Sequence, residues 1–207
     1  MIVILNSACF YLLLSSYFTW FRGATSEYMS YVNSSISAIT IIVTEKTFGP
    51  VIACKLLSGF LLYDTGHILS NLDLYKKKRK LHITFLCHHI ITFALCSSTY
   101  LIDYPTTASN LLMVERTIPI GNLLWFSKFY NFDPLYRVLI KIIFFVAYTY
   151  YRIYHLSYII YQHYHNTKEM FSVYFGILIL LINYTWYFKA IQKIGLSFSK
   201  KKIPVKY

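Results

Sequence analysis

Acidic residues are scarce in this chain. Only 8 of its 207 residues are Asp or Glu, against 20 Lys and Arg, so its formal net charge is +12. The chain also lacks a hydrophilic stretch long enough for a separate soluble domain, which favours a single domain. Its four cysteines lie in apolar runs without a CxxC pair, at Cys9, Cys54, Cys87 and Cys96. This placement favours buried thiols over a disulfide or zinc framework.

Hydrophobic residues, in contrast, are abundant. They make up 57% of the chain, and the mean hydropathy is +0.47. Such values are typical of membrane proteins, and at about 20 residues per span the length allows about six or seven crossings. The sequence therefore predicts an all-α, multi-pass transmembrane bundle. Its predicted spans are at about 1–21, 28–44, 50–70, 82–102, 106–128, 134–163 and 171–191.

The basic residues gather at the ends of the apolar runs. This pattern favours orientation against an anionic cytosolic leaflet, and no nucleic-acid partner is expected because no basic stripe lies on a soluble fold. Placing the basic loop at 76–80 in the cytosol puts most other Lys and Arg on the same side. Seven spans then give an outer N-terminus and a cytosolic C-terminus. If the weaker span at 28–44 does not cross, the N-terminus becomes cytosolic.

We divide the chain into three parts on this basis. Residues 1–27 form a first transmembrane helix with its loop, 28–193 form the main membrane domain, and 194–207 form a basic cytosolic tail. The span at 106–128 contains Pro119, which removes a backbone donor, and Gly121, which loosens the next turn. A kink is therefore predicted there.

Several ionisable residues lie inside the apolar runs. His88 and His89 are adjacent in one span, and Asp64 and Glu115 lie in two others. Charged and polar groups are costly in hydrocarbon, so they usually mark sites or pathways. In the alternating topology, Asp64 and the two histidines lie about 10 Å below the cytosolic boundary, and Glu115 lies about two turns deeper.

These groups favour a polar pocket open to the cytosolic leaflet, although a buried network that locks helix packing remains the alternative. A histidine there could act as a general base, and Asp64 could orient it by accepting a ring N–H. The predicted pocket consists of Asp64, His67, His88, His89, Thr92, Glu115 and Asn122. For Arg152 and His155, three residues apart in a later span, packing is the favoured interpretation.

No metal or other cofactor is expected. The chain has no HxxxH or HxxH pair. Adjacent histidines on one helix diverge by about 100°, so His88 and His89 would not both face one metal.

Four motifs in order resemble one known family over 28–191. They are Gly59-Phe60-x-x-Tyr63-Asp64, His88-His89-x-x-Thr92-x-x-Leu95, Glu115-x-Thr117-x-Pro119-Ile120-x-Asn122-x-x-Trp125 and Asn183-Tyr184-x-Trp186-Tyr187-x-x-x-Ile191. This pattern resembles the TLC domain family, which includes TRAM proteins, Lag1-type ceramide synthases, CLN8-like proteins and small TLC-domain proteins. The H-D-x-x-D element of the synthases is missing, with only Asp103 nearby, so the small non-synthase members are most similar. Those members have an arginine where this chain has Leu124.

The resemblance implies a role in membrane lipid homeostasis through lipid binding, sensing or transport. The implied partners are membrane lipids. The implied location is an endoplasmic-reticulum-like or other cellular membrane, or a host-cell membrane if the chain is viral. One alternative is an acyl-CoA-dependent N-acyltransferase acting on sphingoid bases, with His88, His89 and Asp64 as its candidate catalytic residues and the 76–80 loop meeting the coenzyme A phosphates. Another is a trafficking factor or cargo receptor. Because the H-D-x-x-D element of the synthases is missing, a protein that is not an enzyme is favoured.

Overall fold

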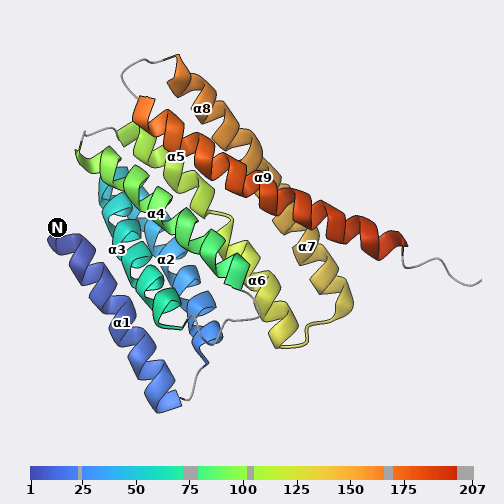
Figure 1. The fold of residues 1–207 in the computed structure, drawn as a ribbon. Coiled ribbons are helices and arrows are strands. Elements are labelled where there is room, and N and C mark those ends of the chain that lie inside the picture. Colours follow the sequence, from blue (N-terminus) through green and yellow to red (C-terminus); the bar gives the residue numbers. More distant parts are fainter. Residues whose placement is uncertain (23–24, 72–78, 102–104, 166–169, 200–207) are drawn as a thin grey trace, which may run out of the picture.

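The structure is a computed structural model that describes residues 1–22, 25–71, 79–101, 105–165 and 170–199. Within these ranges the chain forms helices and no strand, as the sequence predicts (Figure 1). Most of the basic loop predicted at 76–80 lies outside the described residues, as does Asp103.

The first three helices are α1 (Ile2–Arg22), α2 (Ser26–Phe48) and α3 (Pro50–Ser70). Thr25 caps α2, since its side-chain oxygen accepts a hydrogen bond of 3.2 Å from the backbone N–H of Tyr28. Gly49 has φ 91°, which a glycine adopts without strain, and Pro50 then begins α3. The chain therefore reverses in a tight turn between α2 and α3.

The next segment contains α4 (Arg79–Leu101), α5 (Pro105–Glu115) and α6 (Ile118–Phe129). The span predicted at 106–128 is thus divided at Arg116 and Thr117, which confirms the predicted kink. Pro119 explains the division, because its ring conflicts with the carbonyl four residues earlier, that of Glu115, and it has no N–H to donate.

The last helices are α7 (Pro134–Tyr148), η2 (Thr149–His155), α8 (Leu156–Tyr164) and α9 (Met170–Ser199). Of these, α7, η2 and α8 form one continuous rod over 134–164, which matches the helix predicted at 134–163. Its central π-helical turn, η2, was not predicted. Helix α9 continues to Ser199, so residues 194–199 of the predicted tail are helical, and 200–207 lie outside the described residues.

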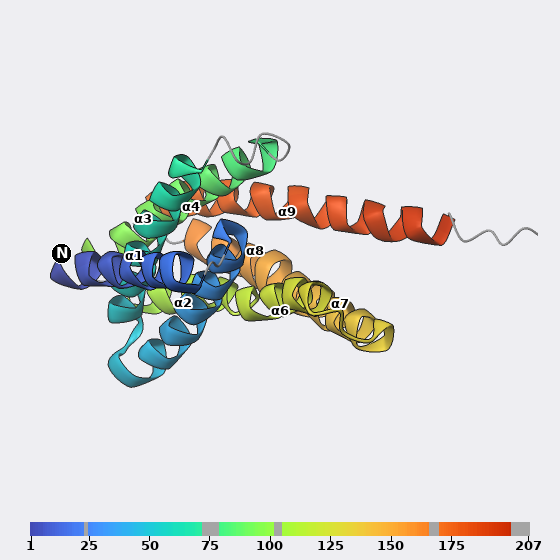
Figure 2. The ribbon, with the colours of Figure 1, turned by 90° about the horizontal axis from the view of Figure 1, so that it is seen from below.

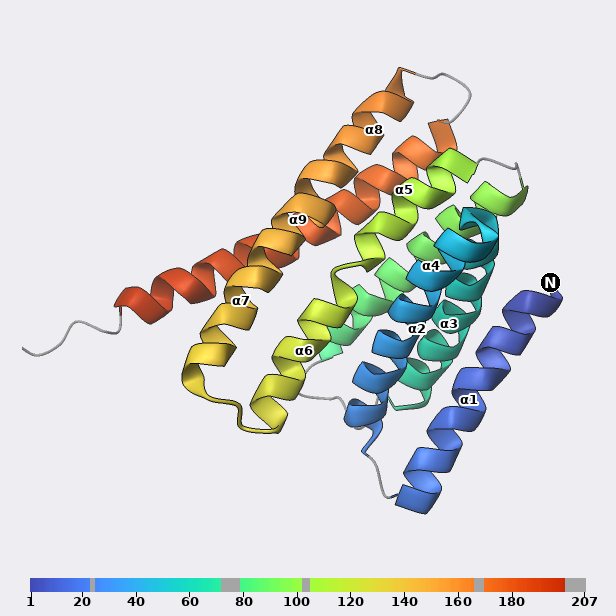
Figure 3. The ribbon, with the colours of Figure 1, turned by 180° about the vertical axis from the view of Figure 1, so that it is seen from behind.

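The central helix of the bundle is α3, which packs against α1, α2, α4 and α5. On the other side, α6 packs on α2 and α7, and α9 packs on α4 and α8. Figures 2 and 3 show the last part of α9 projecting beyond the other helices. Successive passes run in opposite directions, which brings residues from α2, α3, α4, α6 and η2 to one region.

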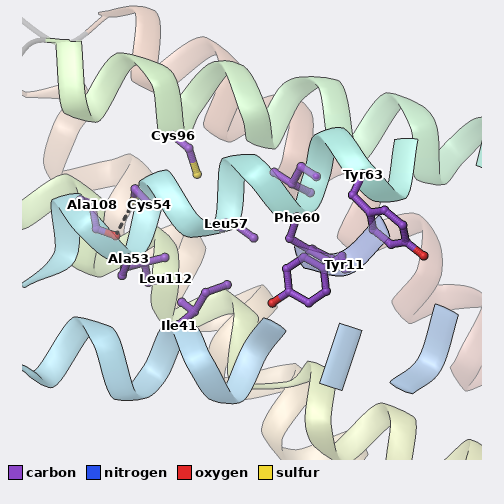
Figure 4. Close-up of a cluster of buried hydrophobic side chains, with 11 residues drawn as sticks. Tyr11, Ile41, Ala53, Cys54, Leu57, Phe60, Tyr63, Cys96, Ala108 and Leu112 are labelled. Atoms are coloured by element: carbon purple, nitrogen blue, oxygen red, sulfur yellow. Dashed lines mark hydrogen bonds between the residues drawn. The ribbon is translucent and has the colours of Figure 1, made fainter. Parts of the chain in front are cut away.

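Small side chains allow α3 to approach its neighbours closely. Ala53, Cys54 and Ala108 are fully buried in a cluster with Leu57 and Leu112 (Figure 4). All four cysteines are free. The prediction that all of them are buried is wrong for Cys9 and Cys87, which are exposed because they lie on outward faces of α1 and α4.

Within the part of the chain that the structure describes, two helical stretches, Ile2–Trp20 and Val173–Gln192, are long and apolar enough to cross a membrane. A shorter apolar stretch lies at His82–Ser98. Many apolar side chains on other helices also face outward, including Leu135, Ile142 and Val146 on α7. Exposed apolar surface on this scale is typical of contact with lipid or with other proteins.

Candidate functional site

A cavity of about 230 Å³ lies between α2, α3, α4, the end of α5, α6, η2 and α9. Its lining contains all of the predicted pocket residues except Thr92: Asp64, His67, His88, His89, Glu115 and Asn122. Thr92 lies one turn beyond His88 on α4 and is buried. The tertiary structure therefore brings together polar residues from helices that are far apart in the sequence.

Asp64 and His89 form the closest ionisable pair of the lining. Asp64 Oδ2 lies 3.5 Å from His89 Nε2, and both side chains are buried. Asp64 Oδ1 and His89 Nδ1 have no hydrogen-bond partner among the described residues. Because buried polar atoms are normally paired, these two atoms are suited to contact a bound molecule.

His88 is directed to a different neighbour. Its ring packs edge-on against Trp186 of α9, with 5.6 Å between the ring centroids, and its Nδ1 has no hydrogen-bond partner among the described residues. The two adjacent histidines thus diverge as predicted, with His89 beside α3 and His88 beside α9. Both nevertheless line the cavity.

Asn122 and His67 have neighbours of their own. Asn122 Nδ2 lies within hydrogen-bonding distance of Ser34 Oγ (2.7 Å), Ser35 Oγ (2.8 Å) and the backbone oxygen of Tyr31 (3.1 Å). An amide group has only two N–H donors, so these α2 acceptors fully occupy it. These hydrogen bonds of Asn122 hold α6 against α2. His67 stacks on Tyr63, with ring centroids 5.8 Å apart.

Glu115 is the last residue of α5 and is 5% exposed. The chain turns directly after it, so Arg116 points away from the cavity and contacts Glu45 of α2 at 3.3 Å. Glu115 itself makes no hydrogen bond or ion pair with another described residue. The kink at Pro119 therefore separates two oppositely charged neighbours, and only the acidic one lines the cavity.

Arg152 is a lining residue for which the sequence favoured a packing role. It is 5% exposed; its Nε donates to Thr117 Oγ1 at 2.6 Å, and its Nη1 donates to Asn183 Oδ1 at 3.3 Å. The wider π-helical turn directs Arg152 inward while His155 stacks on Tyr150. The sequence could not indicate the inward direction of Arg152, because residue spacing predicts side-chain directions only for a regular α-helix. Glu27, His82 and Phe85 also line the cavity without having been predicted.

Among the described residues, no group of three or more His, Cys, Asp or Glu side chains is arranged to hold a metal ion. The cavity instead combines unpaired polar atoms with apolar walls that include Phe60, Leu61 and Phe85. Such a lining can bind a molecule that has both polar and apolar parts.

The described residues form a helical protein, and two of its helical stretches are apolar enough to cross a membrane. A family model described as the TLC domain matches residues 2–192, nearly the whole chain. The chain therefore belongs to the TLC domain family, whose members are generally membrane proteins tied to lipid metabolism. No curated protein and no solved structure matches it.

Proposed function

We propose that this protein binds a membrane lipid in the cavity and acts in lipid homeostasis by binding, sensing or transport. The observation that carries the proposal is the set of unpaired polar atoms on Asp64, His88 and His89, in a cavity with apolar walls. A lipid headgroup would satisfy these atoms, and its chains would contact the apolar walls and the surrounding bilayer. In this proposal the chain is of the small non-synthase type.

The proposal includes a multi-pass arrangement in the membrane. In the described ranges the helices form seven passes that alternate in direction, and α7 presents Leu135 and Val146 outward with exposures of 74% and 62%. At about 1.5 Å per residue, the continuous rod at 134–164 is longer than the roughly 30 Å hydrocarbon core. With the basic loop at 76–80 in the cytosol, the cavity would lie near the cytosolic leaflet.

Lipid carried through purification tests this proposal. The full chain is purified in mild detergent, and its bound lipids are compared by mass spectrometry with those of the source membrane. We expect one lipid class to be enriched in the wild type and reduced about tenfold or more in Asp64→Ala/His89→Ala, because the headgroup loses buried polar partners. His165→Ala is the control, since His165 is exposed and lies outside the lining. Equal lipid content in the wild type and the double variant would contradict the proposal.

Acyl transfer is a second candidate function, favoured by the contact between Asp64 and His89 and by the unpaired Nδ1 of His88. In this reaction the amine of a sphingoid base would attack the thioester carbonyl of an acyl-CoA. A histidine would accept the proton of the amine as the C–N bond forms, and would pass it to the sulfur as the C–S bond breaks, so that coenzyme A leaves as the thiol.

An activity assay on the same purified protein distinguishes lipid binding from acyl transfer. Supplied with several acyl-CoAs and sphingoid bases, an acyltransferase would form N-acyl product, and His88→Ala would abolish it. Enriched lipid without any product favours a binding protein. Product lost only in the histidine variant favours the enzyme.

A further inference from the structure

Arg152 has an unusual environment for a buried cation. It is 5% exposed, yet no carboxylate of the described residues lies within ion-pairing distance of its guanidinium. Its hydrogen bonds to Thr117 and Asn183 involve neutral oxygens and use two of its five N–H donors. A buried charge is costly without a partner of opposite sign, so this site favours an anion.

His88 is a second lining residue within electrostatic range of Arg152. It is 7% exposed. Its Nδ1 has no hydrogen-bond partner among the described residues. A ring N–H at this position could donate to the same anionic oxygen group that Arg152 binds.

The acidic residues of the lining do not neutralise Arg152 directly. Glu115 is within electrostatic range of it but forms no ion pair with it. Asp64 contacts His89 instead, and Glu27 lies at the start of α2. Among the described lining residues, Arg152 is the one Lys or Arg side chain. A headgroup that carries an oxyanion and also an amine or hydroxyl donor would therefore fit both parts of the lining.

We propose that Arg152, together with His88, binds the oxyanion of a lipid headgroup, a phosphate or a carboxylate. The planar guanidinium matches either group, because both present oxygens that can accept two parallel N–H bonds. This inference rests on the proposed lipid-binding function and adds the chemical class of the ligand. It makes Arg152 the residue that separates anionic from neutral lipids.

Dissociation constants measured by native mass spectrometry on the full chain test the inference. The probes are dioleoyl phosphatidate, oleate and dioleoylglycerol, with inorganic phosphate as a competitor. We expect the wild type to bind at least one anionic lipid about tenfold or more tightly than the diacylglycerol. Arg152→Gln should weaken that binding about thirtyfold and leave the diacylglycerol unaffected, because only the charge contact is lost. Competition by inorganic phosphate would identify phosphate itself as sufficient for recognition.

Asn183→Asp provides a variant of nearly unchanged shape. It places a carboxylate where the amide oxygen now accepts from Arg152, so it should reduce anion preference by occupying the guanidinium. Arg116→Gln removes a comparable charge outside the lining and should retain the preference. If Arg152→Gln does not fold, Asn183→Asp and His88→Phe give the test.

The outcomes distinguish the role of Arg152 from the proposed lipid-binding function. Unchanged anion preference in Arg152→Gln and Asn183→Asp would overturn the role of Arg152 while leaving lipid binding intact. Equal affinity of the wild type for anionic and neutral lipids would also overturn the role of Arg152 and leave lipid binding intact. A wild type that binds none of the lipids and carries none through purification would overturn the proposed function as well.

Discussion

Single residues determine how closely the helices approach, and Gly59 shows this most directly. It lies on α3 where α1 crosses, and a Cβ at this position would clash with the backbone oxygen of Ile4 and the side chain of Ser7. Ser7 Oγ also donates to the backbone oxygen of Leu56 at 3.0 Å. Small residues of this kind allow backbone contacts between helices in a membrane.

Gly59→Ala should therefore destabilise the protein. The added methyl group meets backbone, which cannot rotate away, so we expect a loss of about 1–3 kcal/mol from overpacking. Gly66→Ala on the same helix is the matched control, because nothing lies within 4 Å of its Cβ position. It should be neutral or stabilising by up to about 1 kcal/mol, since alanine favours a helix more than glycine does. Thermal unfolding in detergent measures both, and equal effects of the two substitutions would contradict the explanation.

Among the helical elements, the break between α5 and α6 determines which charges face the cavity. Glu45, near the end of α2, contacts α5 and the break from outside the cavity. Its Oε1 accepts a hydrogen bond from Ser109 Oγ of α5 at 2.5 Å, and its Oε2 lies 3.3 Å from Arg116 Nη2. The side chain of Arg116 is 27% exposed, so solvent screens part of the attraction. The contact joins α2 to the kinked region beside Glu115.

A double-mutant cycle measures this connection. Glu45→Gln and Arg116→Gln should each lower stability, because each leaves one charge without its partner. The double variant should lose less than the sum of the two, with a coupling of about 1 kcal/mol. Lys46→Gln, an exposed neighbour, serves as the control. Strict additivity in thermal unfolding would show that the ion pair does not hold the break.

Over the whole molecule, alternating passes and an outward apolar surface fit a protein embedded in a bilayer. The distribution of Lys and Arg predicts an orientation with the 76–80 loop on the cytosolic side. Under the proposed function, the cavity lies toward that side, because Asp64 is in the last third of α3 and His88 is in the first half of α4.

Tags at the two ends of the chain test the arrangement. In sealed microsomes treated with protease, we expect the N-terminal tag to be protected and the C-terminal tag to be digested, because seven crossings place the ends on opposite sides. Detergent should then expose the protected tag. Digestion of both tags in sealed vesicles would show an even number of crossings and would point to α2 as the helix that does not cross.

Features that depend on local physics could be predicted from the sequence. The lengths of the apolar runs located the helices, and Pro119 located the break, because a missing N–H and a ring clash act within one turn. The ionisable residues inside apolar runs indicated most of the polar lining of the cavity, since such residues are costly in lipid unless they meet one another or a ligand.

Other features were decided by how the helices meet. The π-helical turn directs Arg152 inward, and no spacing in the sequence indicates that turn. Serines of α2 occupy the amide of Asn122, while Thr92 lies just outside the lining. The adjacent histidines His88 and His89 were evident from the sequence, but their separate neighbours, Trp186 and Asp64, come from different helices. A residue type shows that a partner is needed, and only the packed structure decides which residue provides it.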